Sequence, residues 1–352
     1  RNSTSKWHPL YCEIDGRQSY YTATQIKDAF NKGSDIWMPM LSSHPQLTKF
    51  KYNEIYINDR TYIINEHLAY IIGCLIGDGS LTSAKYNTVR YTCADQDLLD
   101  ILINYGLEIF DDFDIKKVGN KKYDYSIHSK YLCELIRKLD ICKTACYKHI
   151  PDIIIESPKS VIEAFLSGLF DTDGSSDKKN GYIEYCSCSK ILANDVHRVL
   201  LGLGIISTLR HRRNNRRGSY NIYIRGIYAK KFYSMIGFKL SRKQYHEKLL
   251  SIDTNTNNRF YPPTINKIMK DIFLTRKNRG VVDDLNDPKY QSYGKKNRKI
   301  SAYYTSYYSG DRCPSINKLN EFIADTNSYK CNELIDYNKD GKIWLKLKNI
   351  NE

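Results

Sequence analysis

The sequence predicts an α+β fold in which one structural unit is used twice. Two segments share one pattern, IIGCLIGDGS (Ile71–Ser80) and LSGLFDTDGS (Leu166–Ser175), and each is an apolar stretch that ends in Asp-Gly. A spacing of 95 residues separates Asp78 from Asp173, and the same spacing recurs at two lysines further along the chain. Both copies then show the same order of predicted elements: helix, strands, helix, strands, helix.

The elements after each Asp-Gly follow from local patterns. Alternation of apolar and polar residues predicts a strand, and helical periodicity then predicts an amphipathic helix. A basic hairpin with Asn and Gly at its turn comes next, followed by a second helix. In chain order the pairs are strands Val89–Cys93 and Tyr182–Cys186, helices ending near Gly106 and Gly204, hairpins Lys116–Ile127 and Arg210–Ile224, and helices Tyr131–Leu139 and Ala229–Met235.

Small residues mark one face of each apolar helix that ends in Asp-Gly. They lie four positions apart, at Gly73 and Gly77 in the first helix and at Gly168 and Thr172 in the second. Two such stripes allow the helices to pack backbone to backbone, which brings their C-terminal ends together. We therefore expect Asp78 beside Asp173, where the carbonyls at the helix ends already disfavour anions.

Paired carboxylates at this place predict a divalent metal site. Hard oxygen ligands without a neighbouring His or Cys suit Mg²⁺, for which Mn²⁺ can substitute. Metal ions held there can activate water and stabilise the leaving oxygen of a phosphodiester. The alternative is that Asp-Gly merely ends each helix and turns the chain. Repetition at the matched positions Asp78 and Asp173 favours the metal site.

Lys148 and Lys243 occupy the same register of the two copies, each after the second helix of its unit. A lysine near the metal ions can polarise the attacking water or hold the phosphate. The alternative for either is a solvated surface lysine, since the chain is rich in lysine.

The overall charge favours a polyanionic partner. Lys and Arg number 54 against 39 Asp and Glu, a net charge of +15, which by itself does not separate nucleic acid from an acidic membrane surface. Apolar runs are too short to span a bilayer, no signal peptide pattern is present, and the ten cysteines show no disulfide framework. We expect an intracellular protein, cytoplasmic or nuclear according to its host.

The two basic hairpins are the predicted DNA contacts. Their side chains spread positive charge along an extended site, although any one of them can instead belong to a solvated turn. The predicted DNA-binding residues are Lys116, Lys117, Lys121 and Lys122 in the first hairpin and Arg210, Arg212, Arg213, Arg216 and Arg217 in the second.

Over about residues 65 to 250, these features resemble the single-chain, two-motif LAGLIDADG homing endonucleases. The resemblance implies a pseudo-twofold pair of αββαββα units whose saddle-shaped antiparallel sheets lie along the DNA major groove, in a monomer. It implies Mg²⁺-dependent cleavage of a long, asymmetric double-stranded DNA target that leaves 3′ overhangs. Asp78 and Asp173 match the metal-binding acids of the family, with the preceding Gly77 and Thr172 as further metal-site residues. Asp171 aligns with Ile76 and receives no catalytic role.

The resemblance also bears on the lysines. The family has a lysine ahead of an Ile-Pro pair shortly before its second motif, and KHIP supplies Lys148, Ile150 and Pro151 here. Lys243 is followed by Gln-Tyr-His without a proline, so its catalytic role depends on the repeat register alone.

The flanks resemble pieces of a Hint-like intein splicing domain. In SKWHPLY, His8 matches the histidine that activates the upstream splice junction. Thr22–Pro39 resembles the strand that follows, and Asp340–Glu352 resembles the strand before the C-terminal splicing block. The printed chain shows neither a Cys or Ser nucleophile at a recognisable splice junction upstream of His8 nor a His-Asn pair after Glu352, so we expect no splicing and treat His8 as a structural remnant.

The expected organisation has five parts. Residues 251–339 are a basic accessory region in which Pro314 precedes a helix with an apolar face at Ile316, Leu319 and Phe322. This helix belongs either to a DNA-binding module or to the packing of the splicing-domain scaffold. The expected parts are 1–64 (Hint-like), 65–158 (first repeat), 159–250 (second repeat), 251–339 (accessory) and 340–352 (Hint-like strand).

Two other functions compete with the endonuclease. One is a cleavage-inactive, maturase-like nucleic-acid-binding protein of the same fold, and the other is a degenerate protein-splicing element. Retention of both Asp78 and Asp173 favours an active nuclease. The intein-like flanks argue against a maturase, because maturases are encoded by introns.

Overall fold

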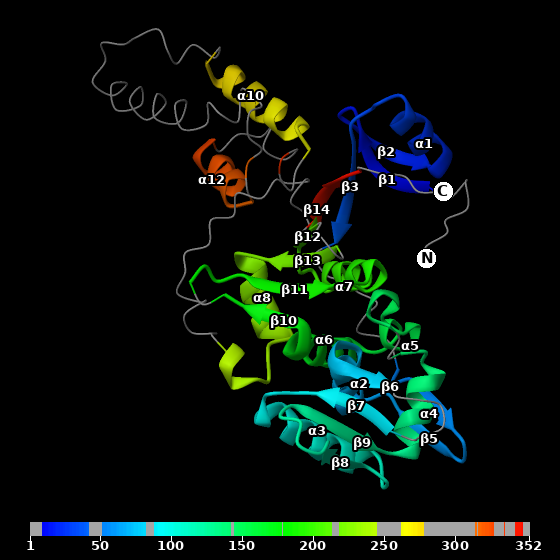
Figure 1. Cartoon of the computed structure of the whole chain (residues 1–352). Coiled ribbons are helices and arrows are strands. Elements are labelled where there is room, and N and C mark those ends of the chain that lie inside the picture. The colour runs from blue at the N-terminus through cyan, green and yellow to red at the C-terminus, as the bar shows by residue number, and fades with distance from the viewer. Residues whose placement is uncertain are drawn as a thin grey trace. The chain divides into compact units, whose positions relative to one another are not determined.

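The computed structural model of the chain forms two compact units (Figure 1). The flanking unit combines residues 1–42 with 255–352, and the repeat unit comprises residues 43–254. The structure describes residues 9–41, 51–81, 88–141, 144–177, 179–212, 218–244, 262–277, 314, 316–326, 334 and 342–347.

Within the repeat unit, two successions of seven elements match one another in order and type. The first consists of α2 (Glu66–Asp78), β6 (Gly79–Leu81), β7 (Thr88–Thr92), α3 (Gln96–Ile109), β8 (Asp114–Lys117), β9 (Asp124–His128) and α4 (Lys130–Lys138). The second consists of α6 (Lys159–Asp173), β10 (Gly174–Ser176), β11 (Ile183–Ser187), α7 (Lys190–Gly202), β12 (Ser207–Arg212), β13 (Ser219–Ile224) and α8 (Ile227–Met235). The predicted repeat is therefore confirmed.

Each repeat forms a four-stranded antiparallel sheet. The strand orders, β6-β7-β9-β8 and β10-β11-β13-β12, are the same permutation of the two sets of strands. The mixed helix-and-sheet class is confirmed, and most predicted bounds agree within a few residues. The exception is α3, which continues through the buried Gly106 to Ile109 and ends where the chain turns extended at Phe110.

Helices α2 and α6 form the centre of the repeat unit. A Cβ added at Gly73 would lie 2.2 Å from the carbonyl oxygen of Phe165, and one added at Gly168 would lie 2.2 Å from that of Tyr70. Such a distance is far inside van der Waals contact, so the two backbones touch where side chains are missing. The stripe of small residues predicted from the sequence is confirmed.

The hairpin of β4 (Glu54–Ile57) and β5 (Arg60–Ile63) belongs to the repeat unit, whereas the sequence assigned it to the N-terminal flank. The buried Tyr62 explains the difference, because its ring lies 5.2 Å from that of Phe110 and 6.0 Å from that of Tyr131. These are ordinary distances for aromatic pairs, so the hairpin packs against the first repeat.

The flanking unit joins both ends of the chain in one sheet of order β14-β3-β1-β2. Its strands are β1 (Pro9–Ile14), β2 (Arg17–Thr22), β3 (Ile36–Leu41) and β14 (Lys342–Lys346). The predicted C-terminal strand is thus present as β14, which pairs antiparallel with β3 and places Trp344 opposite Pro39. His8 lies outside the described residues.

The expectation of a strand along Thr22–Pro39 is wrong for most of that segment. Residues Ala23–Asn31 form helix α1, and only the end of the segment enters β3. Thr22 and Gln25 make a capping box, in which each side chain accepts a hydrogen bond from the backbone N–H of the other residue. This Thr-x-x-Gln pattern is a helix start signal.

A predicted helix completes the core of the flanking unit. Helix α12 (Ile316–Thr326) follows Pro314 as expected and buries Leu319 and Phe322. They pack in one cluster with Trp37, Trp344 and residues of α10 (Thr264–Lys277). Helix α12 thus packs into the core of the flanking unit, while a DNA-binding role of residues 251–339 stays a prediction. The basic run Lys295–Lys299 lies outside the described residues.

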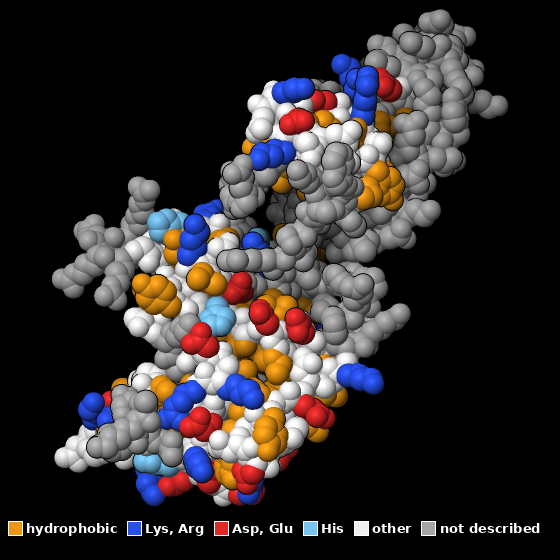
Figure 2. Space-filling model, turned by 90° about the vertical axis from the view of Figure 1, so that its right-hand side faces the viewer, with side chains coloured by type: hydrophobic (Ala, Val, Ile, Leu, Met, Phe, Trp, Pro, Cys, Tyr) orange, Lys and Arg blue, Asp and Glu red, His pale blue; other side chains and the backbone are white. Residues whose placement is uncertain are grey.

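Charged side chains of both signs are interspersed on the surface. Figure 2 shows one face of the molecule, on which Lys and Arg alternate with Asp and Glu rather than gather in one patch. Within the described parts of the chain, none of the helices is both long and apolar enough to cross a bilayer.

Candidate active site

The two motif helices end at the same place. Asp78 is the last residue of α2 and Asp173 the last residue of α6, and both helices turn directly into the first strand of their sheets. A Cβ on Gly77 would lie 2.0 Å from the Oγ1 of Thr172, which shows how closely these last turns approach. The structure therefore places the two aspartates beside each other at the centre of the repeat unit.

Burial disfavours the ionised form of both carboxyls, and the charge of Asp78 adds to this effect at Asp173. Desolvation and the charge of Asp78 together raise the pKa of Asp173 to about 6, against the opposing influence of Lys148 and Lys243. Desolvation also raises the pKa of Asp78, again opposed by the two lysines. A divalent cation bound between two buried, neighbouring carboxyls would favour their ionised forms.

Lys148 reaches the end of α2. It follows the short 3-10 helix Ala145–Tyr147, and its Nζ donates a hydrogen bond of 2.5 Å to the carbonyl oxygen of Gly77. Its own carbonyl accepts 2.6 Å from the Oγ of Ser189, the residue that caps α7. The ammonium group therefore lies one residue from Asp78 and is held by the second repeat.

Lys243 reaches the end of α6 in the corresponding way. Its buried Nζ donates to the carbonyl oxygens of Phe170, Asp171 and Gly174, at 3.0, 2.6 and 2.6 Å. Desolvation lowers the pKa of Lys243 to about 8. The two predicted lysines thus hold equivalent positions, although Lys243 is enclosed and Lys148 is more exposed.

Asp171 binds the backbone of the segment just before Lys243. The sequence did not reveal this role. Its buried carboxylate accepts from the hydroxyl of Tyr70 at 2.7 Å and from the backbone N–H groups of Lys239 and Leu240 at 3.0 and 3.3 Å. It therefore links α2, α6 and the chain just before Lys243. In the sequence, the signal was an acidic residue within an apolar motif, at the position where the other motif has Ile76.

The oxygen donors at this centre fit a divalent metal. The carboxylates of Asp78 and Asp173 can be supplemented by water, as Mg²⁺ prefers. The Gly77 carbonyl accepts from Lys148, and the Thr172 hydroxyl donates to the Leu169 carbonyl at 2.8 Å. Each oxygen keeps a lone pair that can face a metal ion, so the predicted role of Gly77 and Thr172 stays a prediction. Among the described residues, no group of three or more His, Cys, Asp or Glu side chains surrounds a potential metal position.

The predicted DNA-binding residues divide into three groups. Arg210 and Arg212 are exposed on β12. The lysines of the first hairpin are also exposed, but Lys116 pairs with Asp114, and Lys121 with Asp124 at 3.0 Å. The remaining arginines, Arg213, Arg216 and Arg217, lie outside the described residues.

Residues on the middle strands of the sheets were missed. Arg90 on β7 lies in one row with Ser126 and the predicted Lys116. Arg225 directly follows β13 and continues the alternation of Asn221, which pairs with the predicted Arg210. The signal was the alternation along each strand, since residues two apart share a face. The prediction from the sequence rested instead on the Lys and Arg residues near the hairpin turns.

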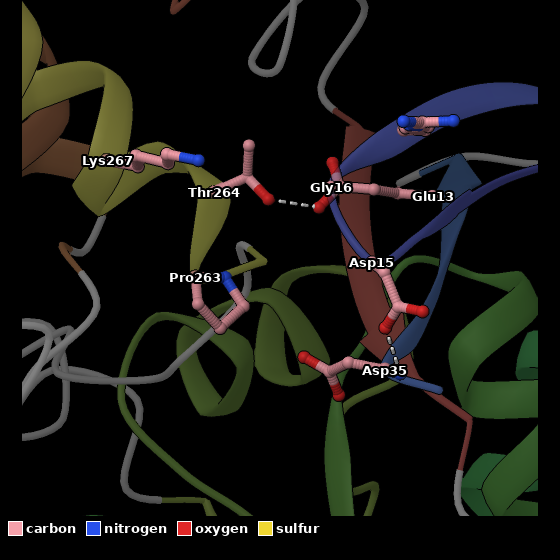
Figure 3. Close-up of a pocket in the computed structure, with 8 residues that line it drawn as sticks. Glu13, Asp15, Gly16, Asp35, Pro263, Thr264 and Lys267 are labelled. Carbon is pink, nitrogen blue, oxygen red and sulfur yellow. Dashed lines mark hydrogen bonds between the residues drawn. The ribbon is translucent and has the colours of Figure 1, made fainter. Parts of the chain in front are cut away.

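A hollow in the flanking unit is a second candidate site, with the acids Glu13, Asp15 and Asp35 along its wall (Figure 3). These groups already have partners. Glu13 accepts from the Oγ1 of Thr264 at 2.5 Å, Asp15 accepts from the backbone N–H of Asp35, and Asp35 pairs with Lys346. These contacts connect α10 with β1, and β14 with the segment just before β3. The acidic side chains around the hollow therefore have a structural role.

Residues 160–237 match the family model of the LAGLIDADG-like domain. This range covers α6 to α8, the second repeat.

Curated relatives match larger parts of the chain. Replication factor C small subunit of Methanocaldococcus jannaschii is 33% identical over 219 residues, which are 60% of this chain and 11% of that protein. DNA polymerase of Thermococcus hydrothermalis is 30% identical over 49% of this chain and 11% of its own length. Replicative DNA helicase DnaB of Nostoc sp. is 27% identical over 55% and 25%. The chain therefore spans about a tenth to a quarter of these relatives.

Two solved structures share low similarity with the chain. I-DmoI in complex with DNA and Mn is 23% identical, with a TM-score of 0.40, and covers 49% of this chain and 97% of its own. Full-length DUF199/WhiA from Thermatoga maritima is 15% identical, with a TM-score of 0.38, over 81% and 92%.

Proposed function

We propose that the chain is a site-specific endonuclease that cleaves a long, asymmetric double-stranded DNA target in the presence of Mg²⁺ and leaves 3′ overhangs. The observation that carries the proposal is the juxtaposition of Asp78 and Asp173 at two touching helix ends, each beside a lysine. The match of the second repeat to the LAGLIDADG-like domain supports it.

The two repeats supply two equivalent sets of groups, as the cleavage of two DNA strands requires. Asp78 and Asp173 would hold Mg²⁺, which when bound acts as a Lewis acid and lowers the pKa of water. Lys148 and Lys243 bring positive charge next to the carboxylates, where a phosphate gains negative charge during hydrolysis. The two sheets would lie along the duplex and position it over this centre.

We also propose that this nuclease is carried by an intein. The flanking unit is built from residues 1–42 and 255–352, which precede and follow the repeat unit in the sequence. This order is expected when one domain is inserted into another. The relatives have unrelated names, from a replication factor to a ribonucleoside-diphosphate reductase subunit, and the chain matches only a minor part of each. A segment shared by proteins of such different functions is typical of an insertion.

The test is cleavage selection from a randomised DNA library with the full chain and Mg²⁺. Recovery of cut duplexes that share one long sequence, with 3′ overhangs and no products in EDTA, is the expected result. Specific retention of duplexes without any cutting would replace the proposal by the cleavage-inactive binding protein. Absence of both sequence-specific binding and cutting would overturn the nucleic-acid function itself.

A further inference from the structure

The second sheet has an open face on the side opposite its helices. The register of β11, β13 and β12 aligns Glu184, Tyr223 and Thr208 in one row of this face, and Cys186, Asn221 and Arg210 in the next. Residues of the other parity, such as Ile222 and Ile224, are buried in the core. On the open face, Thr208, Cys186 and Arg210 are exposed, whereas Tyr223 and Asn221 on the middle strand are buried. The exposed side chains are those that a bound duplex would meet.

Three arginines surround one tyrosine at the middle of this face. The guanidinium carbons of Arg210, Arg212 and Arg225 lie 5.8, 5.7 and 5.1 Å from the centre of the Tyr223 ring. The Nη2 of Arg212 also donates to the Tyr223 hydroxyl at 2.5 Å. We call these four residues the arginine–tyrosine cluster.

An acidic residue lies within reach of the cluster. The carboxylate of Glu184 accepts 2.7 Å from the Nδ2 of Asn221. Desolvation, and after it hydrogen bonding to Glu184, raises the pKa of Tyr223. A carboxylate at this place repels DNA phosphates, whereas it can accept from the amino group of cytosine. The face therefore offers hydrogen-bond donors and an acceptor side by side, the two kinds of group that the edges of base pairs require.

The first sheet does not have this cluster. Arg90 is paired with Ser126 at the place where Glu184 is paired with Tyr223 in the second sheet. By the same register His128 corresponds to Arg225, and Asp124 to Asn221. The two halves of the repeat unit therefore present different chemistry to the two halves of a target.

We infer that the arginine–tyrosine cluster reads guanines in the major groove and makes the half of the target that faces the second sheet the more strongly discriminated half. This inference rests on the proposed function. An arginine donates two hydrogen bonds to O6 and N7 of guanine. Packing against one aromatic ring restricts the guanidinium groups before binding, which reduces the entropy that binding removes.

The test measures binding of the full chain, without Mg²⁺, to the duplex recovered by selection. Each guanine is replaced in turn by 7-deazaguanine, which keeps its pairing but lacks the N7 acceptor. For the guanines read by the cluster we expect the Kd to rise by about 5- to 150-fold. That penalty should fall to near unity in whichever variant, Arg210→Ala, Arg212→Ala or Arg225→Ala, removes the arginine that reads the replaced guanine.

A tyrosine pair supplies the matched control. Tyr223→Phe keeps the ring and removes the hydroxyl that accepts from Arg212, so it should reduce discrimination at the guanine read by Arg212. Tyr220→Phe removes a hydroxyl from the opposite face of the same strand and should leave discrimination unchanged. If specific binding persists but no 7-deazaguanine penalty depends on the three arginines, the inference fails while the proposed function stands. If no duplex is specifically bound, the proposed function fails as well.

Discussion

Asp78 and Asp173 provide the most direct test of the chemistry. We expect Asp78→Asn or Asp173→Asn to reduce cleavage by at least about 100-fold, since each removes a charge that holds Mg²⁺. Specific DNA binding should remain nearly intact, because the proposed DNA-contacting side chains lie on the sheets and not at the helix ends. Gel-based cleavage and binding assays on one duplex separate the two effects. Undiminished cutting by both variants would remove these aspartates from the metal site.

The raised pKa of Asp173 also predicts how stability depends on pH. Its carboxyl holds a proton up to about pH 6 in the folded chain but releases it near 3.8 when unfolded. Metal-free protein should therefore lose stability as the pH rises from about 4 to 6, by roughly 2–3 kcal/mol. Chemical denaturation across this range is the measurement, and Asp173→Asn should weaken the dependence. Added Mg²⁺ should stabilise the native chain above pH 6, and an unchanged unfolding midpoint with Mg²⁺ would contradict the metal site.

The lysines allow a comparison between residues of equal charge. Lys148 donates to the Gly77 carbonyl next to the aspartates, whereas Lys121 pairs with Asp124 on an exposed hairpin. We expect Lys148→Ala to slow cleavage about 100-fold and Lys121→Ala to slow it less than about tenfold. Single-turnover rates at saturating protein make the comparison independent of binding. The reverse order would exclude Lys148 from the active centre.

The packing of α2 on α6 predicts an unusual response to alanine. Gly73→Ala or Gly168→Ala places a Cβ 2.2 Å from a backbone carbonyl of the facing helix, so the helices must separate. We expect a loss of about 3 kcal/mol or more in the free energy of unfolding, together with loss of cleavage. Gly202→Ala near the end of α7 is the control. No atom of another part of the chain lies within 4 Å of its new Cβ, and it should be neutral or stabilising by up to about 1 kcal/mol. Equal effects at all three positions would contradict backbone contact.

Elements whose cause is local could be predicted from the sequence, and those that depend on distant packing could not. The small residues and the Asp-Gly of each motif predicted the C-terminal parts of α2 and α6, and alternation predicted β7 and β11 within a few residues. Helix α1 was not predicted, because Thr22–Pro39 was assigned by its resemblance to a strand of a splicing domain. The Thr22–Gln25 capping pattern indicates a helix start instead. The β4–β5 hairpin was assigned to the wrong unit because Tyr62 packs on Phe110, a contact that local patterns do not contain.

In the candidate active site, too, some features could be predicted from the sequence and others depend on distant contacts. The repeat register predicted the aspartates and lysines, whose positions the structure brings together. It did not predict the role of Asp171, which depends on backbone N–H groups some seventy residues away. The cluster around Tyr223 requires the pairing of β12 with β13, because charge alone does not show which arginines share a face.

Division into two units makes a prediction about the unfolding of the whole chain. Each unit has its own core: α2 and α6 in the repeat unit, and Trp344 with Leu319 and Phe322 in the flanking unit. Domains with separate cores unfold as separate cooperative units. We therefore expect two transitions in calorimetry. Trp344→Ala should lower one of them by the equivalent of about 3–5 kcal/mol, and Gly168→Ala should lower the other.

The same experiment connects stability to function. Mg²⁺ and the specific duplex should raise only the transition that Gly168→Ala lowers, because both bind the repeat unit in the proposed function. Cleavage should therefore survive Trp344→Ala at temperatures below the lower transition. If Trp344→Ala and Gly168→Ala instead shift one common transition, the two units fold as one, and the flanking unit has to be counted among the structures that hold Asp78 and Asp173 in place.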